Sequence, residues 1–220
     1  MLVVGLDPSY PPFEYLGAQG TPEGYDVELA EALAESIGVK PVFVSLDFNS
    51  LYDAIKSGKL DVAISSLEPA PEYLDQLRFS RPYYNAGQVL LVDQGFEGAR
   101  ELRDLAGYTV GVEASSEGDL KLRELTPQIS GLRVHAYSTQ EALFEALSDG
   151  EVAGAVTDRV AAAIQSHRVG GTVVGPAITD VPFVVVARRC DVSLADALDR
   201  SLEELDSRGF LAELEGKWLR

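Results

Sequence analysis

The sequence predicts an α/β fold built from two similar halves with largely parallel strands. Three observations lead to this prediction. Short apolar runs typical of buried strands alternate with stretches of helical periodicity. A segment of the first half recurs in the second half. The 220 residues are also enough for two lobes of about 100 residues each.

The first predicted elements follow one another in the order βαβαβ. Leu2 to Leu6 is a short apolar strand. From Tyr25 to Ile37, apolar residues recur on one face and glutamates on another, which predicts a helix. Val42 to Val44 and Val62 to Ile64 are the next strands, and a short helix from Leu51 to Ser57 lies between them.

A weak internal repeat relates the two halves. Residues 51–64 align without a gap on residues 143–156, and each copy reads as a helix, a glycine stop and a buried strand. Residues 4–7 likewise match residues 110–113, and both segments end in an acidic residue. Ligands of open α/β sheets bind outside the carboxyl ends of the strands. The repeat therefore predicts that these ends carry the binding residues, which would include Asp7, Ser65, Ser66, Glu113, Thr157 and Asp158.

The remaining segments predict how the halves are joined. Two apolar strands, residues 88–92 and 182–186, are placed to link them, and the tail from residue 193 onward has helical spacing that would complete the first half. We therefore expect a discontinuous first lobe of residues 1–87 and 186–220, a second lobe of residues 88–185, a ligand cleft between the lobes and a two-strand hinge.

Composition excludes several classes of function. The 18 Lys and Arg against 35 Asp and Glu give a net charge of −17, which disfavours nucleic acid as a partner. No run approaches the roughly 20 apolar residues of a membrane span. The single cysteine, Cys190, allows no internal disulfide, and His135 and His167 lack metal-ligand spacing, so we expect no metal and no cofactor. The chain starts directly with a strand, so it is either cytoplasmic or trimmed of a leader.

Ordered motifs carry a resemblance to a known family. Residues 5–15 and 24–30 resemble the opening of the family 3 solute-binding proteins, the amino-acid-binding receptors of ABC importers. Later motifs of that family are matched by residues 57–62, 71–72, 79–84 and 156–158. The resemblance implies a type II periplasmic-binding fold that closes on a small ligand. It also implies an ABC permease as partner and a periplasmic or extracellular place on the membrane-associated side.

The resemblance also implies which residues of the first lobe contact the ligand. Tyr10 and Phe48 match two aromatic positions that often sandwich it, although ordinary core packing is the alternative for both. Asp7 matches a position that contacts the ligand's side chain. The stretch that supplies a carbonyl and a hydroxyl is matched by Ser66, Leu67 and Glu68.

In the second lobe, Ser115 and Ser116 match a turn whose amides and hydroxyl contact a carboxylate. Asp158 matches the acid that takes the ligand's α-ammonium, and its alternative role is the N-cap of the helix that follows. Glu113 enters the predicted site through the repeat, as the counterpart of Asp7.

Two departures from the family pattern bear on the ligand. Tyr73 stands where the family usually has the arginine that clamps the ligand's α-carboxylate, and Glu68 stands where a hydroxyl is expected. Tyrosine cannot replace a bidentate arginine. The predicted pocket then gathers four acids, Asp7, Glu68, Glu113 and Asp158, which favours a cationic ligand. Arg78 and Arg159 are the alternative clamps.

The sequence thus predicts a solute-binding protein of an ABC importer that binds an amino acid or related small amine and catalyses no reaction. Two alternatives stay open. One is a sensory ligand-binding module of a membrane receptor. The other is an enzyme resembling cyclohexadienyl dehydratase on the same fold, with Glu68 or Glu113 as general acid if burial raises its pKa.

Overall fold

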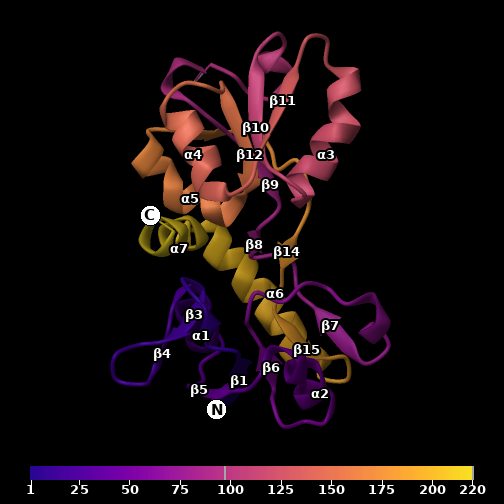
Figure 1. Cartoon of the computed structure of the whole chain (residues 1–220). Helices are drawn as coiled ribbons and strands as arrows, with labels where there is room; N and C mark the ends of the chain where they lie inside the picture. The colour runs from indigo at the N-terminus through magenta and orange to yellow at the C-terminus, as the bar shows by residue number, and fades with distance from the viewer. Residues whose placement is uncertain (97, 220) are drawn as a thin grey trace. The chain divides into compact units, whose positions relative to one another are not determined.

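The computed structural model describes residues 1–96 and 98–219 and forms two compact units (Figure 1). Unit 1 consists of residues 1–84 and 182–219, and residues 85–181 make up unit 2. The chain therefore crosses between the units after Tyr84 and again after Val181. The sequence predicted these boundaries between the lobes a few residues later, after residues 87 and 185.

Unit 1 contains a five-stranded sheet in the order β5-β1-β6-β15-β7. Its strands are β1 (Leu2–Leu6), β5 (Pro41–Ser45), β6 (Val62–Ala63), β7 (Leu77–Phe79) and β15 (Val186–Arg188). Strand β1 pairs in parallel with β5 and β6, whereas β15 is antiparallel to β6 and β7. The sheet is therefore mixed, with its parallel part formed by the N-terminal strands.

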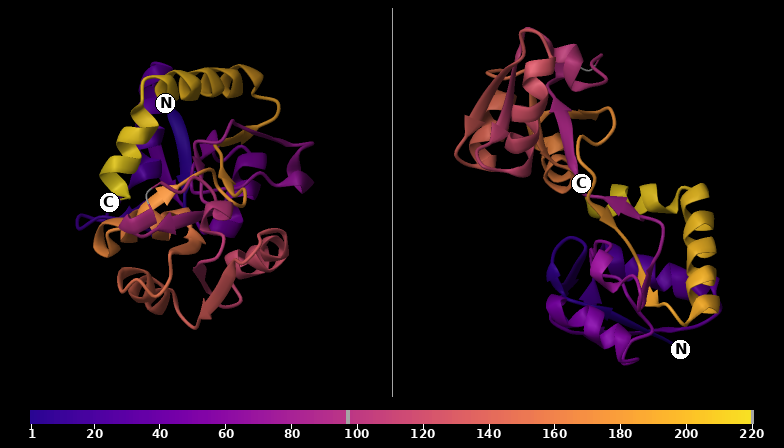
Figure 2. Two further views of the ribbon diagram at one scale, coloured as in Figure 1. Left: turned by 90° about the horizontal axis from the view of Figure 1, so that it is seen from above. Right: turned by 90° about the vertical axis from the view of Figure 1, so that its right-hand side faces the viewer.

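Four helices and a small second sheet complete unit 1. The helices are α1 (Tyr25–Ser36), α2 (Leu51–Lys56), α6 (Val192–Ser207) and α7 (Phe210–Trp218). The small sheet joins β2 (Ser9–Tyr10), β3 (Glu14–Leu16) and β4 (Pro22–Glu23), and two short 3₁₀ turns are η1 (Phe48–Ser50) and η2 (Pro71–Tyr73). The C-terminal helices contact α1, and α6 also contacts β15, so the yellow tail of the chain belongs to unit 1 (Figure 2).

Unit 2 contains a second five-stranded sheet in the order β11-β10-β12-β9-β13. Its strands are β9 (Gln88–Val92), β10 (Thr109–Glu113), β11 (Arg133–Tyr137), β12 (Gly154–Asp158) and β13 (Thr172–Val174). Helices α4 (Gln140–Ser148) and α5 (Arg159–Val169) cover one face, and α3 (Glu117–Leu125) covers the other (Figure 1). Three 3₁₀ turns are η3 (Gln94–Phe96), η4 (Leu102–Leu105) and η5 (Thr126–Gln128).

Alternating side chains of β9 supply both cores of unit 2. Leu90 packs into the cluster on the α3 face, together with Val112 and Leu122. Leu91 packs into the opposite cluster, together with Leu143. Because successive side chains of a strand point to opposite faces, the apolar run of residues 89–92 indicates burial on both sides.

The repeat in the sequence corresponds to a repeated substructure. Both sheets have the same pattern of strand directions, with β10 parallel to β11 and β12, and with β9 antiparallel to β12 and β13. The three parallel strands also follow the same order, whereas the fourth position holds the last strand of the sheet along the chain in unit 1 and the first in unit 2. The aligned helix–strand segments are α2–β6 in unit 1 and α4–β12 in unit 2. The carboxyl end of β1 is thus equivalent to that of β10, and the carboxyl end of β6 to that of β12. In each unit these two strand ends lie at one edge of the sheet, called the carboxyl edge below.

Of the two strands predicted to join the units, the segment 182–186 begins with the crossing strand, whereas the other prediction is wrong. Residues 88–92 were expected to link the halves, but they form β9, which is buried inside the sheet of unit 2 and paired on both edges. The crossing segments are β8 (Tyr84–Asn85) and β14 (Pro182–Phe183), which pair with each other. An interior strand of a sheet and a buried strand that joins two units are both apolar. Hydrophobicity alone therefore could not show which of these roles β9 has. Among the described residues, no helix has the length and apolar character to cross a membrane.

Candidate functional site

At the carboxyl edge of unit 1, Asp7 follows directly after β1. Its Oδ2 accepts a hydrogen bond from the Phe48 backbone N–H at 2.8 Å. Its own N–H donates to Ser65 Oγ at 2.9 Å. Asp7 therefore joins η1 to the segment after β6. The three residues Asp7, Phe48 and Ser65 lie together at one edge of the sheet.

Two aromatic side chains at this edge are exposed. Tyr10 and Phe48 each have 44% relative exposure, which is unusual for aromatic residues beside a buried sheet. Tyr10 stacks on Phe13, with ring centroids 5.7 Å apart and planes 10° apart. Both rings therefore stay partly open to solvent within unit 1, while Tyr10 also packs against the buried Phe13.

Residues 66–68 differ in how they are held. Ser66 has a positive φ of 49°, which is strained for a residue other than glycine. The Leu67 side chain is fully buried, and its carbonyl accepts the Val184 N–H at 2.8 Å. Glu68 is exposed, and its carbonyl accepts the Tyr52 hydroxyl at 2.7 Å.

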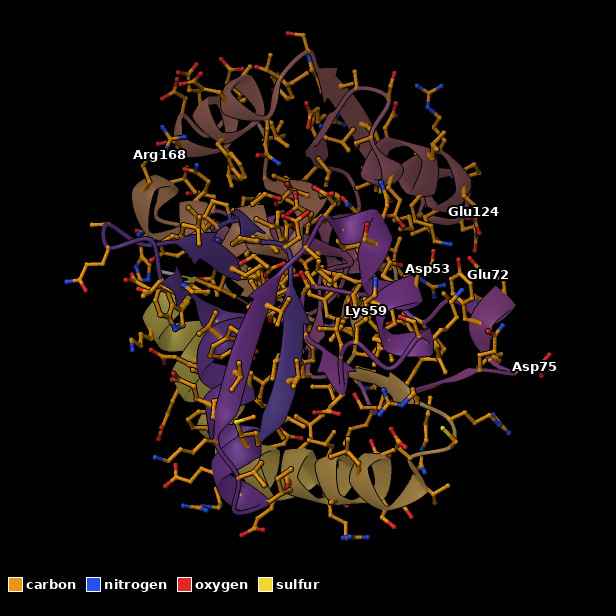
Figure 3. All side chains as sticks on the ribbon, turned by 90° about the horizontal axis from the view of Figure 1, so that it is seen from below. Asp53, Lys59, Glu72, Asp75, Glu124 and Arg168 are labelled. Carbon is orange, nitrogen blue, oxygen red and sulfur yellow. The ribbon has the colours of Figure 1, made fainter. Side chains whose placement is uncertain are left out.

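Tyr73 packs against α2. Its ring lies 5.1 Å from the Tyr52 ring, and Lys56 Nζ lies 4.2 Å from the centroid of Tyr73. Burial raises the pKa of Tyr52 to about 12, with smaller contributions from the negative charges of Glu68 and Glu72. Glu72 and Asp75, on either side in the sequence, project outward at the surface (Figure 3). Tyr73 thus makes structural contacts that an arginine could not copy.

At the carboxyl edge of unit 2, Asp158 ends β12 and begins α5. Its Oδ1 accepts the Ala161 N–H at 2.8 Å, so Asp158 is the N-cap of α5. Its Oδ2 accepts Gln140 Nε2 at 3.2 Å. Asp158 therefore has the capping role that was the alternative to ligand binding. It leaves a half-buried carboxylate at the end of the strand.

The neighbouring strand β10 places Glu113, Ser115 and Ser116 at the same edge. Glu113 is half-buried at the end of the strand. Ser115 has a positive φ of 64°, and its N–H donates to Asp119 Oδ2 at 3.0 Å. Ser116 caps α3 by accepting the Asp119 N–H at 3.1 Å. The two serines thus close the first turn of α3.

The two arginines considered as substitute clamps have different surroundings. Arg78 pairs with Asp196 at 2.6 Å and with Asp199 at 3.3 Å on α6, so its charge is compensated inside unit 1. Arg159 lies in the first turn of α5, next to Asp158, and its Nε is buried without a hydrogen-bond partner among the described residues. Of these two arginines, Arg159 is therefore the one with unused donor capacity.

A buried acidic network behind the edge of unit 1 was not predicted as functional. Glu14 is 1% exposed and Asp26 is fully buried. Both lie beside the Ser65–Ser66 segment, where Glu14 Oε1 accepts the Ser65 hydroxyl at 2.8 Å and Asp26 Oδ2 accepts the Ser66 N–H at 2.7 Å. Both acids lie in segments that resemble family motifs, residues 5–15 and 24–30, and Asp26 also lies in the first turn of a helix. Neither the motifs nor the helix position indicates that the two carboxyl groups lie close together.

No group of three or more His, Cys, Asp or Glu side chains in residues 1–96 and 98–219 is arranged to hold a metal ion. The functional chemistry at the two edges consists of carboxylates, hydroxyls, exposed aromatic rings and one arginine. Such groups recognise small polar ligands by hydrogen bonds and charge.

Comparison with known proteins identifies relatives over the whole chain. The model of the bacterial extracellular solute-binding proteins, family 3, matches residues 2–220. The arginine-binding extracellular protein ArtP of Bacillus subtilis (strain 168) is 33% identical over 219 residues, which cover 99% of this chain and 85% of that protein.

Two solved structures extend the comparison. An ancestral arginine-binding protein bound to arginine is 30% identical with a TM-score of 0.58, and the match covers 100% of this chain and 98% of that one. An ancestral cyclohexadienyl dehydratase has a TM-score of 0.86 at 24% identity, with 99% and 92% of the two chains covered, and shows that the fold is shared. The fold is that of the two-lobed type II periplasmic-binding proteins.

Proposed function

The chain belongs to the bacterial extracellular solute-binding proteins of family 3, and we propose that it captures a cationic amino acid or related small amine for an ABC importer. The observation that carries the proposal is the set of charges at the two edges. Half-buried carboxylates lie at both edges, Asp7 in unit 1 and Glu113 and Asp158 in unit 2. Tyr73 replaces the expected arginine. The arginine-binding relative supports the same ligand class.

In this proposal, unit 1 binds the cationic side chain. The exposed faces of Tyr10 and Phe48 attract a cation through their negative π-faces, an interaction worth about 2 kcal/mol or more once desolvated. Asp7 is anchored by the Phe48 N–H through Oδ2. An anchored carboxylate loses little side-chain entropy when it pairs with a ligand's guanidinium or ammonium.

Unit 2 binds the α-ammonium group through Asp158. Its two oxygens already accept one N–H each, and a carboxylate has about four lone-pair sites, so capacity for a ligand is left. The capping bonds also fix the rotamer. Ser66, Leu67, Glu68, Glu113, Ser115 and Ser116 complete the proposed set of contacts.

The ligand's carboxylate, where it has one, is held by Arg159 in this proposal. Arg78 is excluded because two aspartates compensate its charge. The buried Nε of Arg159 gains a partner if a carboxylate binds nearby, and an unpartnered buried donor costs about 1–3 kcal/mol.

A thermal-shift screen followed by calorimetry tests the proposal. The panel contains arginine, lysine, ornithine, polyamines, guanidines and quaternary amines, with glutamate, glutamine and leucine as uncharged or acidic controls. A ligand at 100 times its dissociation constant adds about 2.7 kcal/mol of stability. We expect the cationic compounds to raise the melting temperature most, and tight binding of glutamate would contradict the charge argument.

We further propose that the protein transfers its ligand to a permease, lies on the periplasmic or extracellular side of the membrane, and catalyses no reaction. The dehydratase neighbour contributes the fold alone. Glu68 is exposed, and general-acid chemistry at neutral pH needs a desolvated carboxyl group. Incubation with prephenate or arogenate, followed by chromatography, should show no loss of water above the buffer control.

A further inference from the structure

Two carboxyl groups meet in the interior of unit 1. Glu14 on β3 is 1% exposed and Asp26 in the first turn of α1 is 0% exposed. The Ser66 hydroxyl lies 3.5 Å from Glu14 Oε2 and 3.5 Å from Asp26 Oδ2, so the two carboxyl groups flank one side chain. Neither acid is among the ion pairs found for the described residues. Two carboxylates without a cation cannot both stay ionised in such a place, because burying an unpaired charge is too costly.

The hydrogen bonds distinguish the two acids. Asp26 Oδ2 accepts the Ser66 N–H at 2.7 Å and the Tyr83 hydroxyl at 2.9 Å. The other oxygen, Oδ1, is buried and has no hydrogen-bond partner among the described residues. A carboxyl group donates only when it is protonated. Two close donors stabilise Asp26 as an acceptor and one stabilises Glu14, so a proton shared by the pair resides more favourably on Glu14.

We propose that Glu14, Asp26 and Tyr83 are positioning residues, which hold one shared proton at neutral pH and fix the Ser65–Ser66 segment in its ligand-binding conformation. The inference rests on the proposed function, because that function places Ser66 among the ligand contacts. It adds three residues that touch no ligand themselves. It also explains how Ser66 keeps its positive φ of 49°, since strained residues persist only where their surroundings hold them.

The network also reaches the point where the chain leaves unit 1. The Tyr83 hydroxyl accepts the Ser66 N–H at 3.2 Å while it donates to Asp26. The Tyr83 backbone N–H donates to the Phe183 carbonyl at 2.9 Å, on the returning segment β14. The binding segment and both crossing segments are thus connected through one tyrosine.

Among the described residues, the titratable groups recorded as acting on this network are acids and phenols. They are Tyr25 on α1, Tyr84 on β8 and Tyr83, while Glu215 on α7 and Asp206 on α6 act on Tyr25. Burial raises the pKa of Glu14, and the nearby charge of Asp26 raises it further. Burial also raises the pKa of Asp26, which the hydrogen bonds from Ser66 and Tyr83 oppose. The hydrogen bonds that lower the pKa of Asp26 therefore favour Glu14 as the residue that holds the proton.

A ligand-free NMR experiment on the full chain tests the network. Carboxyl ¹³C signals and the Ser66 amide signal are followed across the acid and neutral range in the wild type, Glu14→Gln and Tyr83→Phe. We expect one protonated side-chain carboxyl at neutral pH that disappears in Glu14→Gln. We also expect the Ser66 amide shift to follow proton uptake by Asp26, above the pH at which exposed aspartates titrate. Two ionised carboxylates at neutral pH would overturn the inference.

Binding experiments test the positioning role with any cation that binds the wild type. Glutamine copies protonated glutamic acid, so Glu14→Gln should keep the affinity within about twofold, whereas Glu14→Ala should weaken it more. Tyr83→Phe removes one donor and one acceptor and should weaken binding roughly three- to tenfold. Unchanged affinity in both Tyr83→Phe and Glu14→Ala would refute the positioning role. If the wild type binds none of the cations, the proposed function fails, while NMR still decides on the network.

Discussion

At the residue scale, Asp158 combines a structural and a proposed functional role that one substitution separates. Asn is as good an N-cap as Asp, so Asp158→Asn should keep the bond to the Ala161 N–H and leave stability nearly unchanged. It removes the negative charge that the α-ammonium needs. We expect calorimetry to show at least tenfold weaker binding of the cationic ligand, since a hydrogen bond to a charged group contributes about 1.5–3 kcal/mol.

The matched control for this prediction is Thr139→Ala. Thr139 caps α4 through the Ala142 N–H, and its loss should reduce stability by about 0.5–2 kcal/mol without changing affinity. Equal affinities of Asp158→Asn and the wild type would remove Asp158 from the proposed site.

Tyr73→Arg restores the residue that the family usually has, in surroundings that are not built for it. The substitution loses the ring contact with Tyr52, worth about 0.5–1.5 kcal/mol, and brings a second cation close to Lys56. We expect chemical denaturation to show reduced stability, and calorimetry to show weaker binding of a purely cationic amine. Tyr73→Phe, which keeps the ring, serves as control and should change neither measurement by much.

Side-chain chemistry at this scale was only partly predictable. The position of Asp158 at the end of β12 follows from the repeat, because a strand followed directly by a helix leaves its last residue at the cap. The pairing of Glu14 with Asp26 could not be predicted. Twelve positions along the chain separate them, and their contact depends on how β3 folds over α1. The engagement of Arg78 by Asp196 and Asp199 likewise depends on a helix more than 100 residues later.

At the element scale, the tail with helical spacing forms two helices, α6 and α7. Gly209 separates α6 from α7 with φ of +81°, in the left-handed region that disfavours a Cβ atom. No atom lies within 4 Å of an added Cβ there, so backbone strain is the cost. Gly209→Ala should lower the unfolding free energy by about 1 kcal/mol in urea denaturation.

Gly95→Ala is the matched control for that substitution. Gly95 has no positive φ, and its added Cβ would meet only ordinary contact, with Asp93 Oδ2 at 3.6 Å. Alanine at such a site should be neutral or stabilising by about 0.4–1 kcal/mol. A Gly209→Ala protein as stable as Gly95→Ala would contradict the strain argument.

The contact between β3 and α1 should make stability depend on pH through Glu14. Its raised pKa means that the folded state still holds a proton that the unfolded state loses above about pH 4.3. Stability should therefore fall as pH rises from that value toward the raised one, by up to about 1.4 kcal/mol per pH unit. Glu14→Gln cannot titrate, so its urea-denaturation curve should decline less between about pH 5 and 8. The exposed Glu31→Gln is the control and should follow the wild type.

Elements were predictable where a single local pattern decides them. The helix and strand ends at Ser36, Lys56 and Ala63 lie within one residue of the predicted ends, because glycines and changes of periodicity mark them. The role of β9 was not predictable, because the sequence of an interior strand is as apolar as that of a buried strand joining two units. Its place in the sheet depends on pairing with β12 and β13, which are distant in the sequence.

At the scale of the whole molecule, two units with the same pattern of strand directions each carry part of the proposed contacts. If one ligand contacts Asp7 in unit 1 and Asp158 in unit 2, binding must restrict how the units are placed relative to each other. The crossing segments β8 and β14 are the only covalent connections among the described residues. A rearrangement on binding would therefore be absorbed there.

Small-angle scattering measures this restriction directly. We expect a saturating cationic ligand to reduce the radius of gyration of the wild type. At the same ligand concentration, Asp158→Asn should respond less, because its weaker binding leaves more molecules unliganded. A second sample of Asp158→Asn at a concentration that saturates it should recover the compact value if Asp158 contributes affinity alone. An unchanged radius in the saturated wild type would mean that the ligand binds within one unit, and residues of the other edge would then leave the proposed site.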